Sequence, residues 1–165
     1  MNFRRLSPVE DKTLLREAYL WDQDRPQWYR DMDAVYGPDN FQAYIEAAKG
    51  IRRIDVGVFD ASLIGVFILS ERQPSVFDVH VMAKRGASNE ILADAAHQIR
   101  WQLFAQGAQS ISGWIASRNK PLLALANMVG FIRTSLAMLK GTYRGRVINW
   151  VQVVSTREQW LSEQT

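Results

Sequence analysis

A glycine-containing turn between a predicted strand and a predicted helix is the first place where this sequence could do chemistry. The strand covers residues 76–83, and the turn reads Arg85-Gly86-Ala87-Ser88-Asn89 before the helix. The first amides of a helix have no partner within it, and the helix dipole adds partial positive charge there. The turn therefore predicts a phosphate site formed by Gly86 and the amides of Ala87, Ser88 and Asn89, although turns of this kind also occur without a ligand.

The strand before this turn carries an acid and a histidine, Asp78 and His80. Side chains alternate along a strand, so residues two apart lie on one face. A histidine changes its charge near neutral pH, and either group could accept a proton directly or through a water. The alternative is a solvated or hydrogen-bonded pair without a catalytic role. His97, on the following helix, is interpreted as structural.

The elements that must position these residues follow from hydrophobic periodicity and turn residues. Ser7-Pro8-Val9-Glu10 predicts a helix start with serine as the cap and Glu10 at the capping-box position. Further helices are predicted over 41–49, from 88 to Gly107, over 120–129 and from Ser155-Thr156 onward. Alternation predicts strands over 54–58, 63–69, 76–83, 110–116, 131–139 and 146–154. The strand, helix and strand from 76 to 116 predict a right-handed crossover.

Composition indicates a globular protein. The chain has 165 residues, of which 47% are hydrophobic and 22% charged, so a single domain over residues 1–165 is expected. It contains no cysteine, which excludes disulfides, thiolate metal sites and cysteine nucleophiles. No signal peptide or membrane span is predicted, and the expected location is cytoplasmic. The net charge of +3 comes from scattered cations, and nucleic-acid binding is not expected.

The stretch from Trp21 to Tyr36 interleaves aromatic and acidic residues. Asp22-Gln23-Asp24 invites a calcium interpretation, but the glycine and distal glutamate of an EF-hand loop do not follow. No metal site is predicted. The aromatic side chains fit either an acceptor pocket or packing in a core or interface.

The segment Asn119 to Phe131 resembles the closing signature of the GNAT superfamily of N-acetyltransferases. In that signature an asparagine leads into a helix that ends in Gly-Phe, and Asn119, Gly130 and Phe131 have this spacing. The order of predicted elements matches over nearly the whole chain. The resemblance implies an α/β GNAT-like fold: a mixed, mostly antiparallel central sheet flanked by helices, with a central strand–helix–strand crossover.

The resemblance also implies a site for acetyl-CoA. Its loop reads Gln/Arg-x-x-Gly-x-Gly/Ala in the family, and Arg85 matches the first position while Ser88 and Glu90 replace the small residues. A carboxylate about 7 Å from a pyrophosphate costs on the order of 1 kcal/mol per charge pair. Weak binding of acetyl-CoA is therefore expected. The cofactor contacts that the resemblance implies are Val81, Met82, Arg85, Gly86, Ala87, Ser88, Asn89 and Asn119.

Two further positions bear on catalysis in this resemblance. The tyrosine that usually protonates the departing thiolate is replaced by Ala126, which has no proton to donate. Tyr143 could reach in from the last hairpin instead. The fourth strand borders the acceptor cleft in the family, so Asp78 and His80 are the candidates for the base that deprotonates the amine.

Two functions follow from these residues. The first is acyl transfer from acetyl-CoA to an amine, with an eroded cofactor loop and weak or absent activity. The second is a non-catalytic GNAT-like structural or interaction protein, a pseudoenzyme similar in general style to tailed-phage GNAT-like proteins. In that case we expect a protein partner or a homo-oligomer, in the host cytoplasm or in the virion.

Overall fold

The computed structural model describes residues 2–23, 41–49, 52–143 and 146–165. Its elements are, in order, β1 (Phe3–Leu6), α1 (Lys12–Gln23), α2 (Phe41–Lys49), β2 (Arg53–Asp60), β3 (Ser62–Gln73), β4 (Val76–Ala83), α3 (Asn89–Ala105), β5 (Ser110–Ala116), α4 (Lys120–Met128), β6 (Ile132–Tyr143), β7 (Arg146–Thr156) and α5 (Arg157–Glu163). The described part of the chain forms a seven-stranded sheet in the order β1-β2-β3-β4-β5-β7-β6. Of the predicted 21–40 segment, only residues 21–23 lie within the described ranges.

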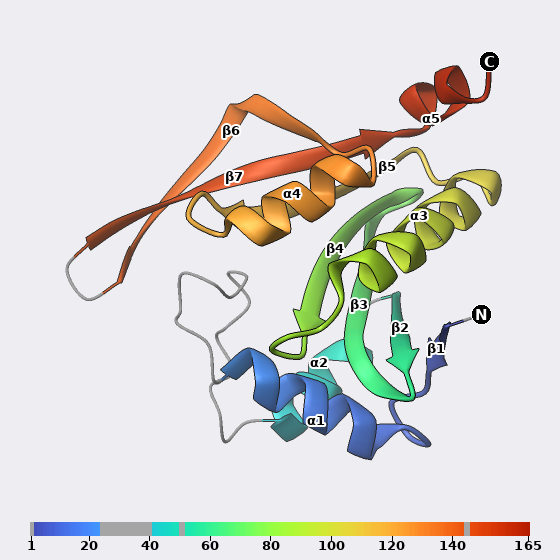
Figure 1. Cartoon of the computed structure of the whole chain (residues 1–165), viewed down its shortest axis with the longest axis vertical. Coiled ribbons are helices and arrows are strands. Elements are labelled where there is room, and N and C mark those ends of the chain that lie inside the picture. The colour runs from blue at the N-terminus through green and yellow to red at the C-terminus, as the bar shows by residue number, and fades with distance from the viewer. Residues whose placement is uncertain (1, 24–40, 50–51, 144–145) are drawn as a thin grey trace.

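The sheet is antiparallel except at its centre. The strands β1 to β4 pair antiparallel in chain order, and β7 pairs antiparallel with both β5 and β6. Among the described strands only β4 and β5 are parallel, and α3 connects them. This confirms the predicted fold class: a mixed, mostly antiparallel sheet flanked by helices, with a central crossover (Figure 1).

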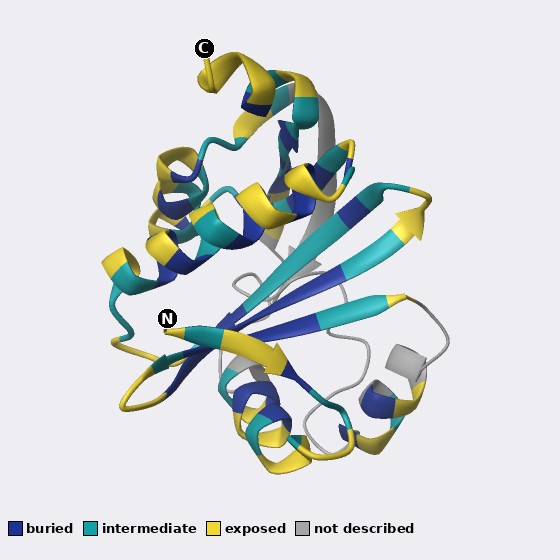
Figure 2. Ribbon diagram, turned by 90° about the vertical axis from the view of Figure 1, so that its right-hand side faces the viewer, coloured by how far each residue is buried: buried dark blue, intermediate teal, exposed yellow. Residues whose placement is uncertain are grey.

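Helices cover both faces of the sheet (Figure 2). On one face, α3, α4 and α5 pack against alternate strand residues in a core that contains Phe67, Phe77, Ile99 and Phe104. On the other face, α1 and α2 pack against the intervening strand residues, such as Val66, Ile68 and Met82. The alternation along β3 and β4 thus divides each strand between two cores.

The N-terminus differs from the prediction. A four-residue strand, β1, precedes the first helix and pairs with β2 from Phe3↔Val58 to Leu6↔Asp55. The Ser7 hydroxyl does accept the amide of Glu10 at 3.2 Å, but the regular helix begins only at Lys12. The carboxylate that reaches back to the amide of Ser7 is that of Asp11, at 2.8 Å, and not that of Glu10.

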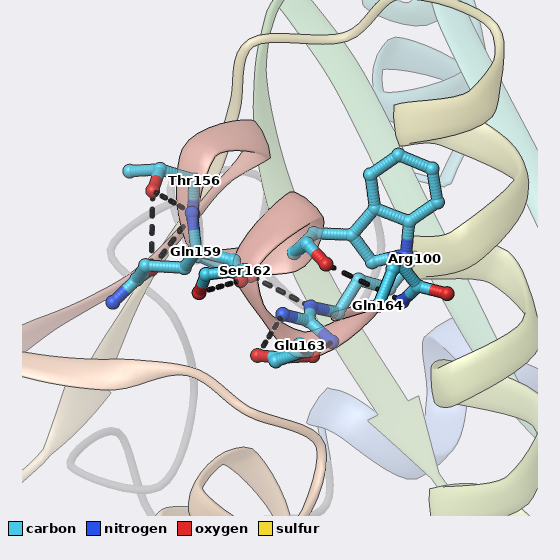
Figure 3. Close-up of polar contacts among 8 residues, drawn as sticks. Arg100, Thr156, Gln159, Ser162, Glu163 and Gln164 are labelled. Carbon is cyan, nitrogen blue, oxygen red and sulfur yellow. Dashed lines mark hydrogen bonds and ion pairs between the residues drawn. The ribbon is translucent and has the colours of Figure 1, made fainter.

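A buried arginine attaches the last helix to α3. Arg100 is 4% exposed. Its Nε donates to Ser155 Oγ at 2.7 Å, and its two terminal nitrogens donate to the Glu163 carboxylate at 2.9 and 2.8 Å (Figure 3). The hydrogen bonds and positive charge of Arg100 lower the pKa of Glu163 below its usual value. Thr156 and Gln159 form the capping box that starts this helix.

None of the helices within these described ranges is long and apolar enough to cross a membrane. The longest, α3, has 17 residues and carries the charged side chains of Glu90, Asp94 and Arg100. A span needs about 20 predominantly apolar residues.

Candidate functional site

The candidate site begins where the two parallel strands separate. β4 and β5 pair at only three positions, Val76↔Ser110, Phe77↔Ile111 and Asp78↔Ser112. β4 continues to Ala83 and β5 to Ala116 without further pairing between them. Figure 1 shows β4 running away from the part of the sheet that contains β7. We call the opening between the unpaired ends of β4 and β5 the splay, and the last pair, Asp78↔Ser112, its vertex.

The backbone of Val81 faces the splay. The amide of Lys84 donates to Ile64 on β3 at 2.9 Å, so by the two-residue alternation Met82 and His80 also direct their peptide groups toward β3. Val81 directs its peptide group toward the β5 side, where it has no pairing partner among the described strands. Met82 is different: its peptide faces β3 and its side chain is 1% exposed in the α1–α2 core. Of these two predicted contacts, only Val81 lies at the opening.

A largely apolar cavity of about 80 Å³ lies at the vertex, between the sheet and the helices α3 and α4. Val79 and Val81 line it from β4, and Gly113 and Ile115 from β5. The helices contribute mainly aliphatic side chains, among them those of Ala96, Ile99, Leu122 and Ala126. Side chains therefore do not fill the space between the separated strands. An apolar cavity of this kind favours an apolar ligand over water.

The turn after β4 uses one of the amides predicted to bind an anion. Ala87 donates its amide to the Lys84 carbonyl at 3.0 Å and closes a tight turn. Gly86 occupies the third position with φ +79°, a left-handed conformation that glycine adopts without steric cost. The Ala87 amide thus holds the turn, and its contact with an anion stays a prediction.

The beginning of α3 keeps free amides. Ser88 is the N-cap, and its hydroxyl accepts the amide of Ile91 at 3.3 Å. The amides of Ser88, Asn89 and Glu90 have no hydrogen-bond partner among the described residues. Glu90 is exposed on the first turn, where its carboxylate is favourable for the helix dipole and unfavourable for a second anion.

Four exposed cations follow the two separated strands. Lys84 and Arg85 lie in the loop after β4, Arg118 lies in the loop after β5, and Lys120 is the first residue of α4. None of them forms an ion pair within the described part of the chain. Of the four, the sequence analysis assigned only Arg85 to the site. The signal for the others was their position directly after parallel strands, where ligands of such sheets usually bind.

Asn119 connects β5 to α4. Its side-chain oxygen accepts the amide of Leu122 at 3.3 Å, its own amide donates to Ala116 at 2.8 Å, and the residue is 1% exposed. These contacts make Asn119 the cap of α4. A direct contact between Asn119 and a cofactor stays a prediction.

The predicted acid–base pair lies on the face opposite α3, and its members have different surroundings. Asp78 accepts the Ser112 hydroxyl at 3.1 Å across the vertex and forms an ion pair with Arg72 at 2.6 Å. Both of its oxygens are thus occupied, and one of them connects the two strands. His80 is two residues further along β4, beyond the last pair. It shares the face of Met82, so its side chain lies on the other side of the sheet from the cavity wall formed by Val79 and Val81. A role of His80 or Asp78 as the base stays a prediction.

Ala126 lines the cavity from α4. The position that the resemblance assigns to a proton-donating tyrosine thus borders the splay, and an alanine occupies it. The side chain of Tyr143, the proposed substitute, lies outside what the structure describes.

Comparison with solved structures supports the fold. The chain is similar to a mutant of spermidine N-acetyltransferase SpeG from Vibrio cholerae, with a TM-score of 0.76 and 14% identity over 100% of both chains. It is also similar to ribosomal-protein-alanine N-acetyltransferase from Brucella melitensis, with a TM-score of 0.71 and 14% identity over 94% of this chain and 99% of that one. The protein yncA from Salmonella typhimurium, solved with its cofactor acetyl-CoA, has a TM-score of 0.67 and 13% identity over 94% and 92%.

At the level of sequence, no family model and no curated protein matches the chain. The similarity is therefore one of architecture, and it extends over almost the whole length of each neighbour. From this architecture we conclude that the chain has the fold of the GNAT N-acetyltransferases.

Proposed function

We propose that this protein binds an acyl-coenzyme A, such as acetyl-CoA, in the splay and transfers its acyl group slowly to an amine. The observation that carries the proposal is the vertex at Asp78↔Ser112: beyond it the unpaired edge of β4 borders an apolar cavity, and β4 leads through one turn to the free amides at the start of α3. The similar structures named after spermidine and ribosomal-protein alanine support an amine as the acceptor.

Each part of the ligand has a matching group in the chain. The diphosphate would lie at the amides of Ser88 and Asn89 near Arg85, where amides and cations favour an anion. The amide-containing arm would pair with the backbone of Val81, as an added strand does. The thioester would then lie beside the cavity at the vertex.

The chain supplies little proton chemistry for the transfer. When bound, the thioester provides the carbonyl carbon that the amine nitrogen attacks, so that a C–N bond forms, the C–S bond breaks and the thiolate leaves. His80, on β4 beyond the last pair, would take the proton that the amine loses. Ala126 cannot return a proton to the sulfur, and a positioned acid typically contributes about 10²- to 10⁴-fold. Slow turnover is the expected consequence.

The second candidate, a non-catalytic interaction protein such as a phage virion component, is favoured by Ala126 and Glu90. It shares the fold but requires no ligand in the splay. The two candidates therefore differ in a simple binding measurement.

The test is a melting curve with and without acetyl-CoA, followed by an assay for acyl transfer to polyamine and peptide amines. At a hundredfold excess over the dissociation constant, binding should add roughly 2.7 kcal/mol of stability. The same melting curve with desulfo-CoA, which keeps the phosphates and the arm, serves as the reference. A melting temperature that millimolar acetyl-CoA leaves unchanged would overturn the proposal and leave the interaction protein.

A further inference from the structure

The cavity at the vertex continues beyond the opening between β4 and β5. Ile111 lines it and precedes the last paired residue of β5, so the cavity continues under the paired part of the sheet. Leu69 and Leu103 also line it, from β3 and α3, and are 2% and 7% exposed. A single water needs roughly 10–15 Å³ of such space, and the cavity offers about 80 Å³.

We propose that the acyl group this protein accepts is an unbranched aliphatic chain of about four carbons, which extends from the thioester into this cavity. The inference rests on the proposed function, because the thioester must lie in the splay for its acyl chain to enter. The chemistry of the walls selects the occupant: the residues between the vertex and the core are aliphatic or aromatic, and burying each added CH₂ against them is favourable.

The same walls discriminate against an acyl chain that ends in a carboxylate. Arg100 is the cation among the lining residues, but its guanidinium donates to Ser155 and to both oxygens of Glu163. A buried carboxylate that lacks a partner is strongly disfavoured. A succinyl chain, of the same length as a butyryl chain but charged, should therefore bind less well.

The experiment measures the dissociation constants of free CoA, acetyl-, butyryl-, hexanoyl- and succinyl-CoA by calorimetry on the full chain. Affinity should rise about fourfold for each CH₂ added from acetyl to butyryl. It should fall for hexanoyl, whose chain exceeds the cavity, and succinyl-CoA should bind more weakly than butyryl-CoA.

A substitution within the cavity provides the second arm. Ala96→Leu places three more carbons on the α3 wall and should remove the preference for butyryl while free CoA still binds. Ala105→Leu is the matched control, since Ala105 is exposed on the same helix and outside the cavity. It should keep the wild-type order of affinities.

The outcomes separate the two proposals. If CoA and all its thioesters fail to bind, the proposed function is wrong and the inference fails with it. Equal affinities for acetyl- and butyryl-CoA, or a butyryl preference that survives Ala96→Leu, overturn the inference alone and leave acyl-CoA binding in place. Because the chain-length series on the wild-type protein needs no variant, the inference can be rejected even if Ala96→Leu does not fold.

Discussion

The two halves of α3 have opposite polar surroundings. At its beginning, the amides of Asn89 and Glu90 have no described partner, and the nearby cations Lys84 and Arg85 are exposed without ion pairs. Further along, Arg100 is buried and its guanidinium bonds Ser155 and Glu163. Within one helix, the polar groups that have partners hold the fold together, and those without partners follow directly after the unpaired end of β4. Backbone amides without a hydrogen-bond partner, close to an unpaired strand edge, therefore indicate the site better than the number of charges does.

The largest expected effect is at the cavity beside the splay, on the α4 wall. Ala126→Tyr places a phenol on the cavity wall and should raise the rate of transfer from acetyl-CoA by about 10²- to 10⁴-fold, because the departing thiolate gains a proton donor. The measurement is steady-state release of free thiol. Ala126→Phe adds the same ring without the hydroxyl and should give no increase. Equal rates for the two variants would mean that the position does not donate a proton.

The next largest effect tests the second half of α3, where the guanidinium of Arg100 has its partners. Arg100→Ala should lower the free energy of unfolding by about 3 kcal/mol, because it leaves the fully buried Ser155 hydroxyl without its partner and removes packing against Gly130. Urea denaturation measures the loss. Arg16→Ala, at an exposed arginine of α1, should stay within about 0.5 kcal/mol of the parent. A small effect of Arg100→Ala would contradict the structural role assigned to this half.

A smaller effect concerns the exposed carboxylate at the start of α3. Glu90→Gln should tighten the binding of acetyl-CoA about fivefold at low salt, since it removes a repulsion on the order of 1 kcal/mol. The gain should shrink as salt screens the charges. Asp94→Asn removes a carboxylate one turn further along, and its effect should be much smaller. If both variants bind alike, the diphosphate does not lie at this helix end.

The smallest effect is on acid stability. The pKa of Glu163 is lowered, first by its hydrogen bonds from Arg100, so its contribution is present above the ordinary value of 4.5 and is lost as pH falls through the folded value. Glu163→Gln should therefore reduce stability at neutral pH and flatten its decline in acid. Asp11, whose pKa is also lowered, by Arg4, keeps part of the decline in the variant. An unchanged acid profile would show that Glu163 does not contribute.

The central strands and the crossover were predictable because local patterns determine them. The ranges predicted for β4 and β5 agree with the structure to the residue, since alternating apolar residues end at clear turn residues on both sides. β1 was missed because its four residues show no alternation and are held by pairing with a distant strand. Glu10 was mistaken for Asp11 because the turn after Ser7 is one residue longer than a capping box.

The site was predictable only where one segment forms it. The turn at Gly86 and the cap at Asn119 follow from local sequence. The network of Arg100 could not be predicted, because its partners lie 55 and 63 residues away and no short pattern links them. The cavity depends on how Ala96, Gly113 and Ala126 meet in space, which the sequence alone does not specify.

Gly130 shows why the Asn119-to-Phe131 signature, which first indicated this fold, contains a glycine. Its φ is +94°, and a side chain there would begin 3.1 Å from the central carbon of the Arg100 guanidinium. Any larger residue would displace the cation that fastens the C-terminal helix. The glycine of the Asn–Gly–Phe signature is thus a requirement of the scaffold, whether or not the protein turns over a substrate. A search built on that signature detects architecture, and activity has to be sought at position 126.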